Sequence, residues 1–218
     1  MRKLLAHRFH MGVDLGQTQN HSGIVVVEQR IESEGEVCPL TFEPLARRVL
    51  VVKHVEQIVL ETSYTTVVRR VREVSRSAEL RDVKLTVAFD ATGLGRVAAD
   101  MLREDPPRGE LMGVSITGGE TGRTKEGLEC VPKTELMMGM QRAFEVEGLC
   151  VAPGMAHWEL LERELLALRR VASAGGIRWV SEEQDDLAMA LAVGLHGYRQ
   201  RLIPTKGERL RRYVELVG

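Results

Sequence analysis

The chain has 218 residues, enough for one large domain or two small ones, and a formal net charge of −1. That balance gives no global basic signal for nucleic acid, so any nucleic-acid surface must come from local clusters of basic residues. Hydrophobic residues make up 44% of the chain without any apolar run approaching the ~20 residues of a transmembrane helix, so we expect a globular protein with no membrane span.

The first 55 or so residues are predicted to form three strands. Residues 9–16 form the first, because Met11, Val13 and Leu15 alternate with Gly12 and Asp14 in the two-residue period of a strand. Residues 22–31 and about 49–55 form the second and third, and residues 32–39 are expected to form a loop. The short connections predict an antiparallel meander.

Asp14 places a carboxylate in an otherwise apolar strand. Strands are depleted in Asp, and an unpaired buried charge is costly, so something must compensate it. A metal ion would do so, and so would hydrogen bonds from a turn that the carboxylate caps, which occur in any fold. Asp14 alone leaves both interpretations open.

The middle of the chain predicts helix and strand in alternation. A helix is expected after Thr62 or Ser63, either of which suits its N-cap. Residues 85–90 then alternate as a strand that ends at Asp90, followed by a glycine turn at 92–95 and a second helix that residues 105–107 stop. Strand, glycine turn and helix in this order open a parallel α/β unit.

The next region carries the candidate DNA contacts. After a strand at 111–116, residues 118–127 are glycine-rich and charged, which predicts a mobile loop or an exposed hairpin. Its Arg123 and Lys125 are candidate DNA-binding residues, because a mobile basic loop can follow a duplex backbone. Lys133 lies at the start of a helix that begins at Pro132, where it could contact a phosphate.

The last third predicts two more helices. One covers about residues 158–168 and is ended by residues 174–176, and a short extended segment follows at 177–180. The other is apolar on almost every side from Leu187 onward, so it should be buried. Asp185 and Asp186 open it, and two carboxylates are more than helix capping requires. Residues 201–218 are expected to form a basic C-terminal tail or helix.

Three acidic points therefore stand out, at Asp14, at Asp90 and at the pair Asp185 and Asp186. The element order predicts an α/β protein of the ribonuclease H-like class, with a mixed central sheet of three antiparallel strands followed by parallel strands, flanked by helices. In that arrangement the three points meet above the sheet. Gathered carboxylates suit Mg²⁺ or Mn²⁺, and two such ions about 4 Å apart serve phosphodiester hydrolysis.

Within that class the chain resembles the nuclease domain of the large terminase subunit, the DNA-packaging motor of tailed phages. The run GVDLG at 12–16 looks like its first motif, VAFDATG at 87–93 like its second and DDLAMALA at 185–192 like its third, and VPKTEL at 131–136 also fits. The resemblance covers about residues 8–200 of what we expect to be a single domain over 1–218.

The resemblance implies an endonuclease that uses two Mg²⁺ or Mn²⁺ ions and cuts concatemeric double-stranded DNA during packaging, without marked sequence preference. It implies a terminase ATPase domain, a small terminase subunit and a portal as partners, and the cytoplasm of a bacterial host as the location. No Gly-x-x-x-x-Gly-Lys-Ser/Thr loop is present, so the chain is either an excised nuclease domain or a stand-alone relative.

The resemblance also assigns roles to the acidic residues. Asp14, Asp90 and Asp186 are implied as the catalytic carboxylates, and these three together with Asp185 as the metal-binding set. Resolvases of the superfamily resemble this chain in placing a metal-binding Asp directly before the small apolar run, which favours Asp186. Our hypothesis is that Asp14 bridges two ions, Asp90 holds one and Asp186 the other, whereas Asp185 caps the helix or accepts a hydrogen bond outside the metal shell.

Two positions depart from the family pattern. Gln184 stands where a His often precedes the double Asp, and Asn20-His21 stands where a further acidic residue is common. Both departures bear on metal affinity or on the number of ions.

Other functions remain open at this point. The run DLGQT at 14–18 also matches the phosphate-binding turn of actin- or hexokinase-like ATPases, which need two such halves and a cleft. A Holliday-junction resolvase of the RuvC type shares the acidic geometry and would prefer four-way junctions. A non-catalytic DNA-binding or assembly module would keep the fold, but it has no use for three uncompensated acidic points.

Overall fold

The N-terminal half of the central sheet is the predicted antiparallel meander. The computed structural model describes residues 3–16, 20–37, 42, 44–92, 95–118, 123–125, 127–173 and 176–200. The meander consists of strands β1 (Leu4–Asp14), β2 (Ser22–Val37) and β3 (Pro44–Ile58). Adjacent strands pair antiparallel, as expected.

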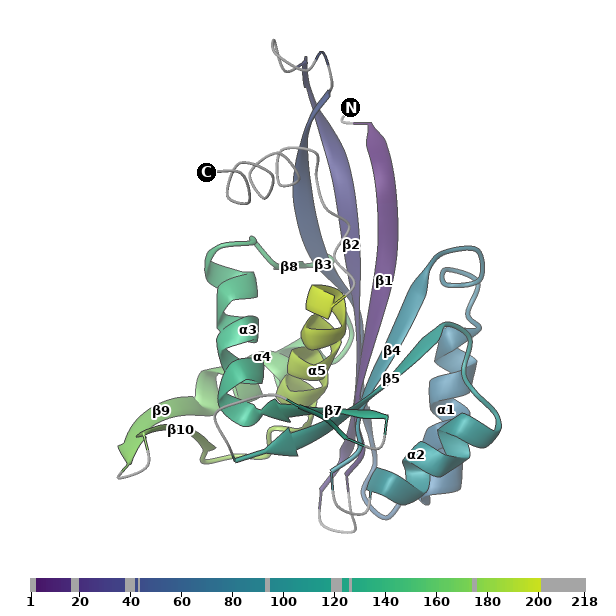
Figure 1. Cartoon of the computed structure of the whole chain (residues 1–218), viewed down its shortest axis with the longest axis vertical. Helices are drawn as coiled ribbons and strands as arrows, with labels where there is room; N and C mark the ends of the chain where they lie inside the picture. Colours follow the sequence, from purple (N-terminus) through teal and green to yellow (C-terminus); the bar gives the residue numbers. More distant parts are fainter. Residues whose placement is uncertain are drawn as a thin grey trace.

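The three strands are longer than the sequence indicated, and the loop expected at 32–39 is wrong over residues 32–37. Those residues continue β2, where Glu32 pairs with Arg47 and Ser33 with Ala46 of β3. Their exposed charged side chains hid the strand, because here the ladder of backbone hydrogen bonds, and not a buried face, holds the two chains together. The outer halves of β1, β2 and β3 extend well past the helices (Figure 1).

The second half of the sheet is parallel to β1. Strand β4 (Leu85–Asp90) pairs with β1, and β5 (Glu110–Thr117) and β7 (Leu128–Pro132) continue the parallel arrangement. Strand β6 (Arg123–Lys125) pairs antiparallel with β7, so residues 123–125 of the glycine-rich region belong to a hairpin, one of the two forms expected there. Strand β8 (Cys150–Val151) lies beside β3. The complete order is β6-β7-β5-β4-β1-β2-β3-β8, a mixed sheet of the predicted class.

Helices cover both faces of this sheet (Figure 1). One face carries α1 (Tyr64–Ser75) and α2 (Gly95–Glu104), and the other carries α3 (Lys133–Glu145), α4 (Trp158–Ala167) and α5 (Asp186–Gln200). Ser63 caps α1 by accepting a hydrogen bond from the N–H of Thr66, as its sequence position predicted. None of the described helices is long and apolar enough to span a bilayer.

The alternation within strands divides the core into two layers. Phe9, Met11 and Val13 of β1 lie in the layer beneath α1 and α2. Ala88 of β4 and the whole apolar run from Leu187 to Val193 lie in the layer of α3, α4 and α5, which confirms that this helix is buried. Polar residues of β1 that alternate with the first set must therefore face α5.

The segment after α4 differs from its prediction. The helix ends at Ala167, and residues 168–173 form strand β9 (Leu168–Ser173), which pairs antiparallel with β10 (Gly176–Ser181) as a separate two-stranded sheet. The helical spacing of the leucines stops there, and β-branched Val171, Ile177 and Val180 favour a strand pair. Residues 201–218, expected as a tail or helix, lie outside the described residues.

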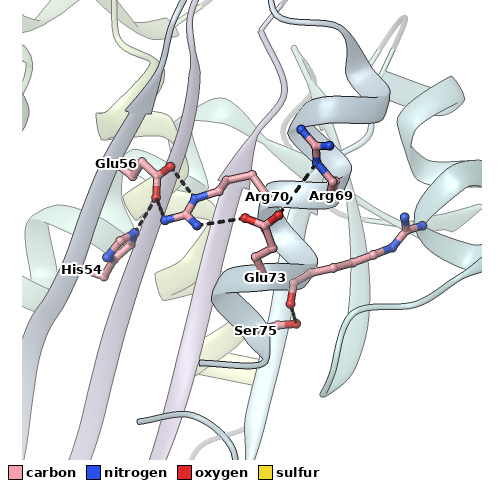
Figure 2. Close-up of polar contacts among 7 residues, drawn as sticks. His54, Glu56, Arg69, Arg70, Glu73 and Ser75 are labelled. Carbon is pink, nitrogen blue, oxygen red and sulfur yellow. Dashed lines mark hydrogen bonds and ion pairs between the residues drawn. The ribbon is translucent and has the colours of Figure 1, made fainter. Parts of the chain in front are cut away.

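A compact network of charges joins α1 to β3 (Figure 2). The Nε and Nη2 atoms of Arg70 lie 2.7 and 3.0 Å from the two carboxylate oxygens of Glu56, and its Nη1 lies 3.0 Å from Glu73. His54 contacts the same Glu56 carboxylate at 3.0 Å. Burial alone would raise the pKa of Glu56, but the hydrogen bonds from Arg70 and His54 outweigh it, and the pKa is lowered.

Candidate active site

Two of the predicted carboxylates lie at the same edge of the sheet because of strand register. Val13 of β1 is paired with Phe89 of β4 in the parallel ladder, so the residues that follow, Asp14 and Asp90, come side by side. Val13 and Phe89 point into the core beneath α1 and α2, so Asp14 and Asp90 point to the opposite face, toward α5.

The third acidic point reaches this edge because α5 packs directly on the backbone of β1 and β2. A β-carbon on Gly12 would lie 1.9 Å from the carbonyl oxygen of Ala190, and one on Gly194 would lie 2.9 Å from the amide nitrogen of Gly12. A β-carbon on Gly23, the partner of Asp14 in the β-ladder, would lie 2.7 Å from the carbonyl oxygen of Asp186. Only glycine permits this approach, which places the start of α5 above Asp14.

Asp186 is buried and only partly satisfied. The residue is only 3% exposed, and its Oδ2 atom has no hydrogen-bond partner among the described residues. Burial raises the pKa of Asp186 to about 6, and the charge of Asp185 adds to the rise, whereas the His21 imidazole and backbone N–H groups oppose it. The Nδ1 atom of His21 lies 3.1 Å from the Ile58 carbonyl oxygen, and this contact holds the imidazole. His21 is thus a neighbour of Asp186 in the folded chain.

Asp14 and Asp90 also have raised pKa values. For Asp14 burial is the main cause, followed by the charges of Asp90, Asp186 and Asp185, with Lys133 opposing them. For Asp90 burial again raises the pKa, against hydrogen bonds from the hydroxyl and the N–H of Thr92, the latter 2.8 Å from Oδ1. The three acidic points therefore influence one another electrostatically, as a cluster without enough positive charge.

Asp185 has a different environment from Asp186. Its Oδ2 lies 2.8 Å from the Nζ of Lys133, the residue that opens α3, and its backbone carbonyl accepts the N–H of Met189 as the first hydrogen bond of α5. Of the two roles expected for the Asp185 side chain, helix cap or hydrogen-bond acceptor, the structure has the second, because Lys133 donates to it and another residue makes the capping bonds. Lys133 was proposed as a phosphate contact, and the structure places it at the carboxylate cluster.

The residue that caps α5 is Glu164, which sequence reasoning missed. Its Oε2 accepts the N–H groups of Leu187 at 2.8 Å and of Ala188 at 2.9 Å. Burial raises the pKa of Glu164 to about 7, the two N–H groups oppose the rise, and the charges of Asp186 and Asp185 add to it. A weak signal was available, since Glu164 lies three residues after Leu161 on the apolar side of its helix, where a charged residue is unusual.

The donor set fits a hard divalent cation. Among the described residues no three His, Cys, Asp or Glu side chains form a ready-made metal-binding group. Asp186 nevertheless has a buried carboxylate oxygen without a partner, and the carboxylates of Asp14 and Asp90 are at the same edge with raised pKa values. Oxygen donors that lack compensating positive charge are the chemistry that Mg²⁺ and Mn²⁺ select.

Basic residues occur in two hairpins of the chain. Arg123 and Lys125, the predicted DNA contacts, belong to β6, and their side chains lie outside what the structure describes. In the β9–β10 hairpin, which the sequence did not predict, Arg169, Arg170 and Arg178 are exposed. Strand β10 ends at Ser181, four residues before Asp185, so this hairpin is joined directly to the acidic pair.

Comparison with known proteins finds a likeness in structure alone. No protein-family model matches the sequence, and neither does any curated protein. The large terminase nuclease from the thermophilic phage G20c aligns over 91% of this chain and 88% of its own length, with a TM-score of 0.53 and 15% identity. This likeness, together with the strand order, confirms the ribonuclease H-like fold.

Two further solved structures were found at lower similarity. One is the nuclease domain of the large terminase g2p from bacteriophage SPP1, solved with bound Mn. The alignment covers 89% of this chain and 87% of that chain, at 9% identity and a TM-score of 0.49. RuvC from Thermus thermophilus covers 89% with 97% of its own chain, at 18% identity and a TM-score of 0.34.

Proposed function

We propose that this chain is a metal-dependent DNA endonuclease of the large-terminase type, which hydrolyses phosphodiester bonds of concatemeric double-stranded DNA during viral genome packaging. One observation carries the proposal: β1, β4 and the start of α5 bring Asp14, Asp90 and Asp186 to one edge of the sheet, where a buried carboxylate oxygen has no partner. A purely structural cluster would be neutralised, since uncompensated buried carboxylates only destabilise a fold.

The fold supports this reading as an analogy. A fold hosts many functions, so the shared architecture with the G20c terminase nuclease counts only alongside the acidic cluster and the sequence motifs that surround it. The motif GVDLG has a structural reason in this chain, because Gly12 admits α5 and Asp14 follows two residues later on the same face.

In the proposed mechanism Asp14, Asp90 and Asp186 are the residues that would hold two Mg²⁺ or Mn²⁺ ions. When bound there, such ions would supply activation of an attacking water and stabilisation of the leaving oxygen of the scissile phosphodiester. Thr92 orients the Asp90 carboxylate through its hydroxyl and its N–H. Lys133 holds Asp185 and places a positive charge at the rim, where a DNA phosphate would lie.

The DNA surface follows from the same geometry. Arg123 and Lys125 of β6 are proposed to contact the phosphate backbone, and so is the exposed arginine set of the β9–β10 hairpin. A net charge near zero makes this binding local and strongly salt-dependent. In this reading residues 1–218 form a single nuclease domain that works with a terminase ATPase domain, a small terminase subunit and a portal in the cytoplasm of a bacterial host.

The experiment is a cleavage assay with supercoiled plasmid and Mg²⁺ or Mn²⁺, with a chelator as one control and Asp14→Asn as the other. We expect nicking and linearisation that need the metal and Asp14 and that show little sequence preference. Absence of cleavage with Mn²⁺ at any protein concentration tested would overturn the proposal. A parallel arm with a four-way junction and a linear duplex of equal length identifies a resolvase, which would cut the junction far faster.

A further inference from the structure

We propose that Glu164 is a positioning residue for Asp186: it fixes the first turn of α5 from a neighbouring helix and thereby sets the direction in which the Asp186 carboxylate faces the cation. The inference rests on the proposed function, because it concerns the metal site of that function. Glu164 contacts no reacting group itself.

The contact is a helix cap made by a residue from elsewhere in the chain. Helix α5 begins at Asp186, so the N–H groups of Leu187 and Ala188 have no partner within the helix. A single oxygen of Glu164 accepts both, at 2.8 and 2.9 Å, and Glu164 is only 3% exposed. Charge-assisted hydrogen bonds of this kind are short, strong and directional.

The residue that would ordinarily make these bonds is present but occupied elsewhere. Asp185 stands at the N-cap position, as the hydrogen bond from Met189 to its carbonyl shows, and Asp is among the best N-cap residues. Its carboxylate instead pairs with Lys133. Because Glu164 makes the capping bonds, both carboxylates of the acidic pair are released from capping, and Asp186 keeps an unpaired oxygen.

Helix α4 contacts the chain both before and after the acidic pair Asp185 and Asp186. Arg163 lies 2.9 Å from Glu183, two residues before Asp185, and the next residue of the same helix, Glu164, binds the amides directly after Asp186. The Arg163–Glu183 pair is exposed and contributes little by itself, whereas the Glu164 contact is buried. Movement of Glu164 would therefore tilt the first turn of α5 and displace Asp186 from Asp14.

Three variants separate positioning from simple stabilisation. Glu164→Met keeps the volume of the side chain but cannot accept a hydrogen bond. Glu164→Gln removes the charge but keeps an acceptor oxygen. Leu161→Ala is the matched control, because Leu161 is fully buried on the same face of α4 in the same core layer as α5, but its side chain accepts no hydrogen bond from the amides of α5.

The readouts are Mn²⁺ affinity by calorimetry, amide exchange at Leu187 and Ala188, melting temperature and plasmid cleavage. We expect Glu164→Met to weaken Mn²⁺ binding by about 10- to 100-fold, the range seen when residues that orient metal ligands are removed, and to speed exchange of both amides. Glu164→Gln should stay within about threefold of wild type, and Leu161→Ala should lower the melting temperature while Mn²⁺ affinity is kept.

Mn²⁺ affinity in Glu164→Met equal to that of wild type would overturn the inference, and so would an equal loss of affinity in Leu161→Ala. If Glu164→Met does not fold, Glu164→Gln provides the test. Because Gln keeps an acceptor oxygen, a loss of Mn²⁺ affinity in Glu164→Gln beyond about threefold would then overturn the inference. Failure of the wild-type protein to bind Mn²⁺ would overturn the proposed function and this inference together. Normal Mn²⁺ binding by wild type with unchanged affinity in Glu164→Met would overturn this inference alone, so the two failures are distinguishable.

Discussion

The two faces of the sheet hold partly or fully buried carboxylates in opposite ways. On the face of α1, Glu56 is bound by two nitrogens of Arg70 and by His54, and its pKa is lowered (Figure 2). On the face of α5, Asp14 and Asp186 have raised pKa values, and an oxygen of Asp186 has no partner. The first arrangement is complete within the protein, whereas the second keeps an unpaired carboxylate oxygen, which in the proposed function would bind a cation.

The difference shows how a structural charge network is told from a functional one. Both groups contain acidic residues packed against a helix, so the count of charges does not separate them. What separates them is compensation, since a structural network stabilises the fold through its own pairs and a binding site keeps unsatisfied groups for its ligand. Variants on the two faces should therefore have opposite effects, which the following predictions test.

The largest expected effect separates Asp186 from Asp185. Asp186→Asn should reduce metal-dependent plasmid cleavage by about a thousandfold or more, the order found when one member of a catalytic unit is removed. Asp185→Asn should keep activity within about tenfold of wild type, because the Asp185 carboxylate is already paired with Lys133 and Glu164 makes the capping bonds. Initial rates of nicking measure both.

Asp100→Asn, on the exposed side of α2, is the matched control and should behave as wild type. If Asp185→Asn is inactive and Asp186→Asn is active, the two roles are reversed. If both variants are fully active, the acidic pair is not part of the site, and the contrast between the two faces fails.

The second prediction concerns the metal-free protein. The pKa of Asp186 is about 6 in the folded protein, against its ordinary value of 3.8, which we take for the unfolded chain. Between these two pH values the folded protein therefore binds more protons than the unfolded chain. Its contribution to stability is present below pH ~4 and is lost as the pH rises through about 6. Two pH units correspond to about 3 kcal/mol, so Asp186→Asn should be more stable than wild type at pH 8 by up to that amount.

Urea unfolding of wild type and Asp186→Asn from pH 4 to pH 8, with a chelator present, measures this difference. The difference should grow with pH in favour of the variant, and saturating Mn²⁺ should reverse its sign by stabilising wild type alone. A difference that does not change with pH would mean that Asp186 is compensated in the folded protein as Glu56 is.

The third prediction places DNA binding on the side of the carboxylate cluster. Reversing the charges of Arg123 and Lys125 together should weaken duplex binding by about tenfold at moderate salt and lower the slope of log K against log salt by about two, one for each lost phosphate contact. All sequences should be affected alike. Fluorescence anisotropy with two unrelated duplexes at several salt concentrations measures this effect.

The control for DNA binding is Arg103→Glu on α2, which should leave affinity and salt slope unchanged. An altered sequence preference in the Arg123 and Lys125 variant would contradict phosphate contacts at that hairpin. An equal loss of duplex affinity in Arg103→Glu would mean that DNA binding is not confined to the side of the carboxylate cluster.

The smallest effect is expected at the complete network. Arg70→Met should destabilise the protein by about 1 kcal/mol, because Glu56 loses its principal partner although both side chains are partly screened by solvent. The pKa of Glu56 in the folded protein lies below its ordinary value of 4.5. The stability that Arg70→Met loses is therefore present above that pH and disappears as the medium becomes acidic. Urea unfolding at pH 7 and pH 3.5 measures it.

Cleavage and Mn²⁺ affinity should stay as in wild type in Arg70→Met, since this network lies on the other face of the sheet. Arg69→Met is the control, because the exposed Arg69 side chain pairs with Glu73 at the longer distance of 3.8 Å, and it should change stability by less than about 0.5 kcal/mol. Loss of cleavage in Arg70→Met without loss of stability would connect the two faces.

Local patterns in the sequence were sufficient for the strands that bear the site. The two-residue alternation in β1 and β4 correctly predicted that Gly12 and Asp14 face away from Met11 and Val13, and the apolar run after Asp186 correctly predicted a buried helix. The same rules failed at residues 32–37 and 168–173, where exposed strands are held by pairing with a neighbour and show no buried face.

Side-chain patterns along the chain thus determined the class of fold, the three acidic points and the faces on which they lie, because periodicity depends only on neighbouring residues. The tertiary structure alone decided how closely α5 approaches β1, which of two adjacent aspartates keeps a free oxygen, and that Glu164 caps their helix. The reason is physical: an N–H group donates a hydrogen bond to any suitable acceptor within about 3 Å in space, whatever their separation along the chain.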